Sequence, residues 1–177
     1  MTPTEHLAAA LAGLGFDADV ETLRTPERLA ELLAEFVPRA ELPPMVPLQT
    51  QSDDVVVIRA VPYHSLCAHH LLPFFGECTI VYKPSGQIAG LGWFPRLLRH
   101  LSRQPQLQER LCAQIADSIY DALAPAAVGV RLTARQMCVE MRGSNSSGIF
   151  ETRTWRGQTL VELSHLCLLY TSPSPRD

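Results

Sequence analysis

Apolar residues recur at helical spacing in two stretches of the chain. Thr-Pro-Glu at 25–27 supplies an N-cap, a proline for the first helical position and an acid for the first turn. Leucines then repeat every three or four residues as far as Phe36, and a longer apolar stripe runs through residues 106–123 and stops before Pro125. The pattern predicts one helix that starts near residue 25 and a main amphipathic helix over residues 106–123.

Four shorter runs have the composition or the alternation of β-strands. They are residues 55–61, 77–82, 128–132 and 136–141. Because neighbours alternate in a strand, Cys138 would face away from Met137 and Val139. It would share its side with Gln136 and Glu140. The order helix, two strands, helices and two strands predicts an α+β domain with an antiparallel sheet.

Prolines and changes of pattern divide the chain into three predicted segments. Prolines at 38, 43, 44 and 47 make an extended connector, so we expect residues 1–48 to be an N-terminal helical segment that ends in this connector. Residues 49–165 form the main domain. The tail at 166–177 continues no pattern of the body, and we interpret it as not native to the fold or as disordered.

Composition and charge favour a globular protein of the cytoplasm. Apolar residues make up 46% and charged residues 19% of the chain, and the formal net charge of −3 gives no reason to expect binding to nucleic acid or to a membrane. No apolar run approaches the roughly 20 residues of a membrane helix, and the apolar stretch at 7–14 lacks the basic region of a signal peptide. The five cysteines are an odd, scattered set, which favours a reducing compartment over a disulfide framework.

The segment Cys67-Ala68-His69-His70 is the most informative for chemistry. Its Cys-x-x-His spacing lets the Cys67 thiolate and the His70 imidazole reach one ion from a single turn, and zinc accepts both kinds of ligand. Cys138 is the candidate for a third ligand, and three protein ligands leave a fourth position for water, as in catalytic zinc sites. His69 would then move protons. The alternative is that the cysteines are buried as small apolar residues and that the histidines lie on the surface.

Several segments of the chain are similar to those of one known family. Residues 67–76, Cys-Ala-His-His-Leu-Leu-Pro-Phe-Phe-Gly, resemble the Cys-Glu-His-His segment of GTP cyclohydrolase I. Five further segments match in the family's order. They are Thr-Pro-Glu-Arg-Leu-Ala at 25–30, Gly90-Leu91, Arg96, Gln-Pro-Gln-Leu-Gln-Glu-Arg-Leu at 104–111 and Met-Cys-Val-Glu-Met-Arg-Gly at 137–143. The resemblance therefore covers roughly residues 25–143.

This resemblance implies a fold, an assembly and a metal. The family has the tunnelling fold (T-fold), in which antiparallel sheets from several subunits close into barrels. Its members are usually homodecamers of two stacked pentamers, with sites between subunits. By resemblance, Cys67, His70 and Cys138 hold Zn2+, and His69 is the proton-transfer residue beside the substrate.

The same resemblance implies how a guanine nucleotide is bound. Gln108 and Glu109 match the family's purine-recognition pair. The Glu109 carboxylate can accept hydrogen bonds from the ring N–H and the exocyclic amine of guanine, which adenine does not offer in that pattern. Arg96 and Arg142 match phosphate ligands, for which a guanidinium provides a bidentate fork. Without the resemblance, the first pair would be interpreted as a solvated helix face and the arginines as ordinary surface charge.

Three positions depart from the family inside the inferred site. Gln136 stands at the position of the family's second mechanistic histidine, and glutamine cannot take up or release a proton near neutral pH. Gly92 and Trp93 replace a Ser-Lys phosphate pair, so an indole that would stack on a ring or pack in an interface replaces a cation. Ala68 replaces an acid. The zinc and guanine features are retained, whereas the triphosphate and second-proton features are eroded.

The sequence thus predicts a zinc-dependent hydrolase of the GTP cyclohydrolase I type. It would open the imidazole ring of GTP by attack of zinc-activated water at C8, release formate and form 7,8-dihydroneopterin triphosphate for pterin and tetrahydrofolate biosynthesis. Glu140 or water would replace the missing histidine, and Arg131 or Arg135 the missing lysine. Two alternatives stay open. One is a divergent paralogue that acts on a less phosphorylated guanine nucleotide or stops at the ring-opened formamide, and the other is a non-catalytic T-fold protein that binds zinc and a purine or pterin.

Overall fold

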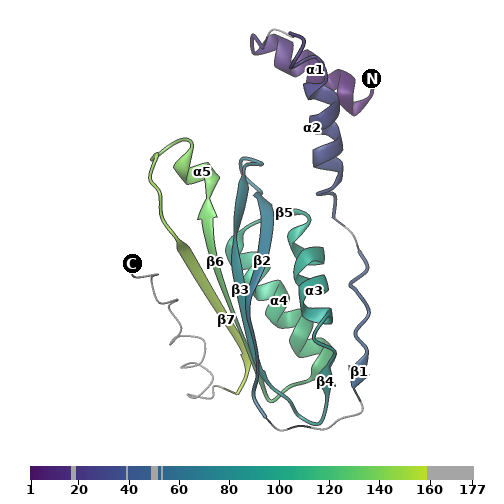
Figure 1. Ribbon diagram of the computed structural model, residues 1–177, viewed down its shortest axis with the longest axis vertical. Coiled ribbons are helices and arrows are strands. Elements are labelled where there is room, and N and C mark those ends of the chain that lie inside the picture. The colour runs from purple at the N-terminus through teal and green to yellow at the C-terminus, as the bar shows by residue number, and fades with distance from the viewer. Residues whose placement is uncertain (17–18, 39, 49–51, 53, 159–177) are drawn as a thin grey trace. The chain divides into compact units, whose positions relative to one another are not determined.

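The computed structural model describes the chain except for residues 17–18, 39, 49–51, 53 and 159–177 (Figure 1). The predicted tail at 166–177 and Cys167 lie outside the described residues. The chain divides into two compact units, Met1–Pro38 and Arg39–Asp177. None of the helices in the described part is long and apolar enough to cross a bilayer.

The first unit contains two helices, α1 (Pro3–Gly13) and α2 (Thr25–Ala34). Thr2 caps α1, because its hydroxyl accepts a hydrogen bond from the Glu5 amide while the Glu5 carboxylate accepts one from the Thr2 amide. The helix predicted from residue 25 is confirmed. Its N-cap is Arg24, which makes no side-chain cap, so the prediction of Thr25 as N-cap is wrong by one residue.

The second unit is an antiparallel sheet backed by helices. Its strands are β2 (Val56–Cys67), β3 (Pro73–Lys83), β5 (Pro105–Gln106), β6 (Ala127–Gln136) and β7 (Phe150–Gly157), in the order β5-β2-β3-β6-β7. Among these described strands, β5 pairs in parallel with β2 and the other pairs are antiparallel. The other elements are β1 (Pro47–Leu48), which pairs with β4 (Ile88–Ala89), and the helices α3 (Trp93–Ser102), α4 (Gln108–Leu123) and α5 (Met137–Glu140). The predicted α+β class with an antiparallel sheet is confirmed.

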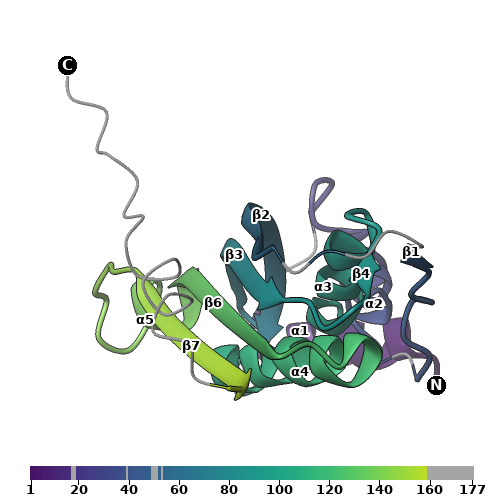
Figure 2. The same ribbon diagram turned by 90° about the horizontal axis from the view of Figure 1, so that it is seen from below.

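One face of the sheet is covered by α3 and α4 (Figure 2). α3 packs on β2, and α4 packs on β6 and β7. Alternate strand residues such as Ile80 and Leu132 are fully buried in one core with helix residues such as Phe94 and Ile115. Burying each such side chain contributes about 1.5–3 kcal/mol, so this core fixes which face each strand residue occupies.

The opposite face of the sheet carries charged side chains. Thr133 on β6 pairs with Glu77 on one side and with Glu151 on the other, so these three residues share the face that α3 and α4 do not cover. Arg131 on β6 donates a 2.5 Å hydrogen bond to Glu151, and Arg153 on β7 pairs with the same carboxylate. Glu151 therefore links β6 and β7 by charge.

The strand predicted at residues 136–141 is wrong beyond its first residue. β6 ends at Gln136, which is the last residue paired with β3 and lies opposite Phe74. The residues that follow have no neighbouring strand among the described residues with which to pair, so their backbone groups are satisfied in the helical turn α5. Cys138 and Glu140 consequently do not share a strand face with Gln136.

The remaining predicted elements are correct in type but differ in extent. The runs at 55–61, 77–82 and 128–132 lie mostly within β2, β3 and β6, which are longer. The main helix starts at Gln108, two residues later than predicted, because the two residues before Leu107 pair with β2 as β5. β7 was not predicted, because its threonines and charged residues form no apolar run.

We predict that Glu151→Gln lowers the free energy of unfolding by about 1 kcal/mol at pH 7, because two arginines lose an ionised partner. The hydrogen bond from Arg131, and then that from Arg153, hold the pKa of Glu151 below its usual value. This stabilisation is present above the unfolded-state pKa of about 4.3 and is lost as the pH falls through the lower folded-state pKa. Urea denaturation at pH 7 and pH 3 tests this, with Glu77→Gln on the same face as the control. A difference between Glu151→Gln and wild type that is as large at pH 3 as at pH 7 would contradict it.

Candidate functional site

A tight turn between β2 and β3 places Cys67 beside His70. The Cys67 carbonyl accepts hydrogen bonds from the amides of His70 (3.3 Å) and Leu71 (2.8 Å). The Cys67 amide donates to the Leu72 carbonyl (2.8 Å), and Leu71 adopts a φ of 53° within the turn. As a result, the Cys67 Sγ and the His70 Nδ1 lie 3.8 Å apart.

The helical turn α5 brings Cys138 to these two residues. The ligand atoms of Cys67, His70 and Cys138 all lie within 4.8 Å of one another. Two ligands of a tetrahedral zinc ion, one sulfur and one nitrogen, lie about 3.6 Å apart. The separation of 3.8 Å between Cys67 and His70 therefore suits a shared ion. The structure brings together the three residues that the sequence predicted as a metal group, although it presents Cys138 from a helical turn and not from a strand.

The short strand β5 supports the turn through Gln106. The Ala68 amide donates to the Gln106 carbonyl (2.9 Å). The Gln106 side chain is 1% exposed, and its amide donates to the Leu101 carbonyl (2.9 Å) and the Gln114 oxygen (2.7 Å) while its oxygen accepts from Arg110 (2.7 Å). The sequence prediction missed Gln106 as a site residue, and its only signal was its place in a segment similar to the family.

The protonation of Cys138 is set by its surroundings. Burial raises the pKa of the Cys138 thiol above its usual value, the neighbouring Cys67 raises it further, and Arg142 acts in the opposite direction. The thiol therefore keeps its proton at neutral pH until a metal displaces it. Because metal and proton compete for the sulfur, metal uptake weakens as the pH falls.

A pocket of about 220 Å³ opens beside the metal group. It is lined by Cys67, His69, Gln106, Leu107, Gln108, Glu109, Gln136, Cys138, Val139 and Phe150. His69 is exposed, and its ring lies edge-on to that of His70 with the centroids 6.1 Å apart. Glu109 places its carboxylate in the first turn of α4. Apolar wall residues, an imidazole and a carboxylate thus surround the space next to the three ligands.

The two glutamines of the pocket are hydrogen-bonded to each other. The Gln136 amide donates to the Gln108 oxygen over 2.8 Å. Gln108 is 4% exposed, so its side chain lies almost entirely beneath the pocket surface. Both residues were candidates from the sequence, and the structure places both in the pocket wall.

The predicted phosphate ligands do not line this pocket. Arg96 is exposed on α3, and Arg142 is exposed just after α5. Trp93 is 3% exposed, and its indole N–H donates to the Pro43 carbonyl (3.0 Å) while its ring packs edge-on against Phe94. The prediction that this indole stacks on a ring or meets an interface is therefore wrong, because it anchors the connector to the core instead.

Arg131 and Arg135, predicted to replace the missing lysine, and Glu140, predicted to replace the missing histidine, all form ion pairs. Arg135 forms an ion pair with Glu140, and Arg131 forms one with Glu151. None of these four residues lines the pocket. The structure therefore gives no support to a role for them in proton transfer or phosphate binding within one chain.

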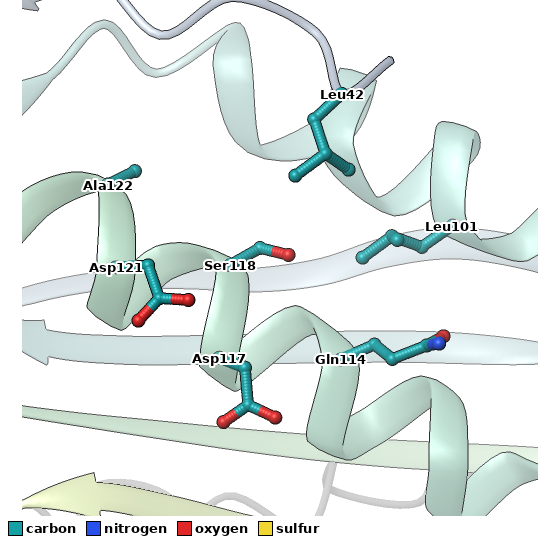
Figure 3. Close-up of a pocket in the computed structure, with 7 residues that line it drawn as sticks. All are labelled: Leu42, Leu101, Gln114, Asp117, Ser118, Asp121 and Ala122. Atoms are coloured by element: carbon teal, nitrogen blue, oxygen red, sulfur yellow. The ribbon is translucent and has the colours of Figure 1, made fainter. Parts of the chain in front are cut away.

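A second pocket, of about 470 Å³, lies between α4, the end of α3 and the connector (Figure 3). Leu42 and Leu101 supply apolar groups, and the Ser118 side chain points toward them from α4. The carboxylates of Asp117 and Asp121 point away from Leu42 (Figure 3), and Asp117 is paired with an arginine of β7. This pocket contains none of the residues predicted to act.

Comparison with known proteins gives consistent matches. The model of the GTP cyclohydrolase I family matches residues 4–165. GTP cyclohydrolase 1 of Hydrogenobaculum sp. (strain Y04AAS1) is 35% identical over 162 residues, which are 90% of this chain and 89% of that protein. The protein of the same name from Nitrosospira multiformis is 41% identical over 145 residues, 78% of this chain and 76% of that protein. Among solved structures, the apo crystal structure of the archaeosine synthase QueF-Like matches with a TM-score of 0.46 and 16% identity, covering 59% of this chain and 96% of that one.

The fold and the site together define an α+β protein in which two thiols and an imidazole that could hold a metal ion lie beside a pocket. The chain belongs to the GTP cyclohydrolase I family. Family membership confirms the resemblance and the hydrolase class that the sequence predicted.

We predict that the metal-free protein binds one Co2+ per chain with strong sulfur-to-metal charge-transfer absorption, because two of the three ligand atoms are sulfur. Cys138→Ser should weaken both the absorption and the affinity, whereas Cys112→Ser should change neither. Cys112 is a suitable control because it is buried and its thiol donates to the Val130 carbonyl, away from the metal group. Equal loss of Co2+ binding in both variants would contradict the assignment. Titration at lower pH should show weaker uptake, as the raised pKa of Cys138 requires.

Proposed function

We propose that this protein is a zinc-dependent GTP cyclohydrolase I, which opens the imidazole ring of GTP at C8, releases formate and forms 7,8-dihydroneopterin triphosphate. One observation carries the proposal: Cys67, His70 and Cys138 converge within 4.8 Å beside a pocket that His69 and Glu109 also line. The relatives named GTP cyclohydrolase 1 support the same activity. We assign this chemistry to residues 49–165 and expect it to take place in the cytoplasm.

Zinc suits the three residues because of their donor atoms. Two thiolates and one imidazole are ligands that zinc prefers, whereas Mg2+ and Ca2+ prefer oxygen. Three protein ligands also leave a position for water or substrate. When bound, zinc lowers the pKa of coordinated water to about 7 and acts as a Lewis acid.

His69 and Glu109 have separate roles in this proposal. His69 is the only imidazole among the described residues that line the pocket, apart from the metal group, and it can give or take up a proton near neutral pH. Glu109 accepts hydrogen bonds from the ring N–H and the exocyclic amine of guanine. Because Gln136 cannot take up or release a proton near neutral pH, His69 carries the proton steps without a second histidine beside it.

Phosphate binding points to an assembly of several chains. Among its described lining residues the pocket includes no lysine or arginine, although a triphosphate requires cations. We therefore propose a homo-oligomer, by resemblance a decamer, in which Arg96 or Arg142 of one copy serves the pocket of another.

A paralogue that acts on a less phosphorylated guanine nucleotide is the second candidate. The observation that favours it is the burial of Trp93, which occupies the position of the family's phosphate-binding lysine and turns into the core. A non-catalytic protein that binds zinc and a purine is compatible with the same residues and is tested by the same assay.

We predict that zinc-loaded protein releases formate and a fluorescent pteridine from GTP, and that kcat/KM for GTP exceeds that for GMP by about 10–150-fold if one arginine contacts the additional phosphates. Each charge-assisted contact contributes about 1.5–3 kcal/mol, and one such contact is missing at Trp93. Parallel assays with GTP, GMP and guanosine measure this advantage. A product from none of the three would contradict the enzymatic proposal and favour the non-catalytic one.

We further predict that His69→Ala lowers kcat by about 10²–10⁴-fold while the zinc content stays at one ion per chain, because the variant removes a proton carrier and no metal ligand. His64→Ala is the matched control, since His64 is an exposed histidine of β2 outside the pocket. Formate release and metal analysis measure both effects. Equal activity of the two variants would rule out His69 as the proton carrier.

A further inference from the structure

Gln136 makes a contact that its predicted place in the mechanism does not explain. Its side-chain amide nitrogen donates to the Gln108 oxygen over 2.8 Å, and its oxygen lies 4.0 Å from the Cys138 Sγ. The residue ends β6, where the sheet meets both the pocket and the metal group. One amide thus touches a buried glutamine on one side and a predicted metal ligand on the other.

The orientation of the Gln108 amide is fixed by the backbone around it. Its nitrogen donates to the Leu132 carbonyl (3.2 Å) on β6 and to the Phe150 carbonyl (3.1 Å) on β7. Both N–H groups of this amide are therefore used, and its oxygen must face Gln136. If either side-chain amide were turned over, two N–H donors or two oxygen acceptors would face each other. Because Gln108 is only 4% exposed, water could not easily satisfy them.

This arrangement ties the start of α4 to the sheet. Gln108 is the first residue of α4 and immediately precedes Glu109, the carboxylate of the pocket. Through Gln108, the first turn of the helix is joined to the backbones of two strands. Gln136 supplies the donor that satisfies the remaining oxygen of Gln108. Removing that donor leaves a buried acceptor without a partner, which favours a shift of the Gln108 side chain.

We propose that Gln136 is a positioning residue, which holds Gln108 and thereby the Glu109 carboxylate in the geometry that binds guanine. It does not act as a substitute proton carrier. The inference rests on the proposed function in one respect, namely that Glu109 binds the guanine base. Its structural part, the coupling of Gln136 to the first turn of α4, is independent of any substrate.

The test is a double-substitution cycle in the full chain with Gln136→Leu, Gln108→Leu and the double variant. We expect each single substitution to weaken GTP binding to the metal-free protein by about tenfold, and the double variant to bind no more weakly than Gln108→Leu. Gln136→His should bind GTP about as tightly as the wild type, because an imidazole N–H can donate to the Gln108 oxygen. Gln136→Asn should not, because its side chain is one methylene shorter.

Two further measurements separate positioning from proton transfer. In the zinc-loaded enzyme, Gln136→Leu should raise KM for GTP by about tenfold, with kcat and zinc content within about twofold of the wild type. Hydrogen exchange without ligand should speed up at the start of α4 and remain unchanged near its end at Leu123. Loss of kcat with unchanged binding and exchange would overturn the proposal, as would additive effects in the double variant.

The outcomes also distinguish this proposal from the proposed function. If wild-type protein fails to bind or turn over GTP while Gln136→Leu still accelerates exchange at the start of α4, the function is wrong and the coupling is correct. If GTP is turned over but Gln136→Leu changes neither exchange nor KM, the coupling is wrong and the function is retained. Should Gln136→Leu fail to fold, the comparison of Gln136→His with Gln136→Asn decides the question.

Discussion

The site depends on the point at which β3 and β6 stop pairing. The last paired residues are Phe74 and Gln136, and in the described part of the chain no strand pairs with the residues that follow Gln136. Backbone groups that cannot be satisfied in the sheet are satisfied in one helical turn, and this turn carries Cys138 to Cys67 and His70. If the pairing were two residues longer, Cys138 would lie in a strand at the height of the β2–β3 turn. The metal group is therefore a consequence of strand length as much as of residue type.

Gln136 and Trp93, two residues at which the sequence departs from the resemblance, both make hydrogen bonds within the fold. Gln136 is bonded to a buried amide, and Trp93 is bonded to the Pro43 carbonyl within the core. Each side chain makes a neutral hydrogen bond, from the half-buried Gln136 to Gln108 and from the buried Trp93 to Pro43. Such groups are costly to remove because their partners would be left unsatisfied. Gln136 and Trp93 are thus both integrated into the fold.

Much of the fold and of the metal group could be predicted from the sequence, because both depend on local patterns. Valine-rich runs and an apolar stripe identified three strands and α4, and the Cys-x-x-His spacing identified two of the three candidate ligands. The turn α5 could not be predicted, since Met-Cys-Val favours a strand. It forms a helical turn because no described strand pairs with the chain beyond Gln136. β7 could not be predicted for the converse reason, because pairing with β6 overrides its polar composition. The Gln108–Gln136 contact joins residues 28 apart in sequence and has no local signal.

The residue proposed to bind the base lines the pocket, whereas the two arginines proposed to bind phosphate, Arg96 and Arg142, do not. The carboxylate of Glu109 lies on α4, whose start is held by the buried hydrogen bonds of Gln108, so the group proposed to bind the base has a fixed place in the chain. Arg96 and Arg142 are exposed and lie outside the lining of the pocket. Exposed guanidinium groups on long side chains can adapt to phosphates of different number, whereas a fixed carboxylate cannot adapt to a different base. Selection for guanine is therefore expected to be strict, and selection for phosphate number to depend on how neighbouring chains bring their cations to the pocket.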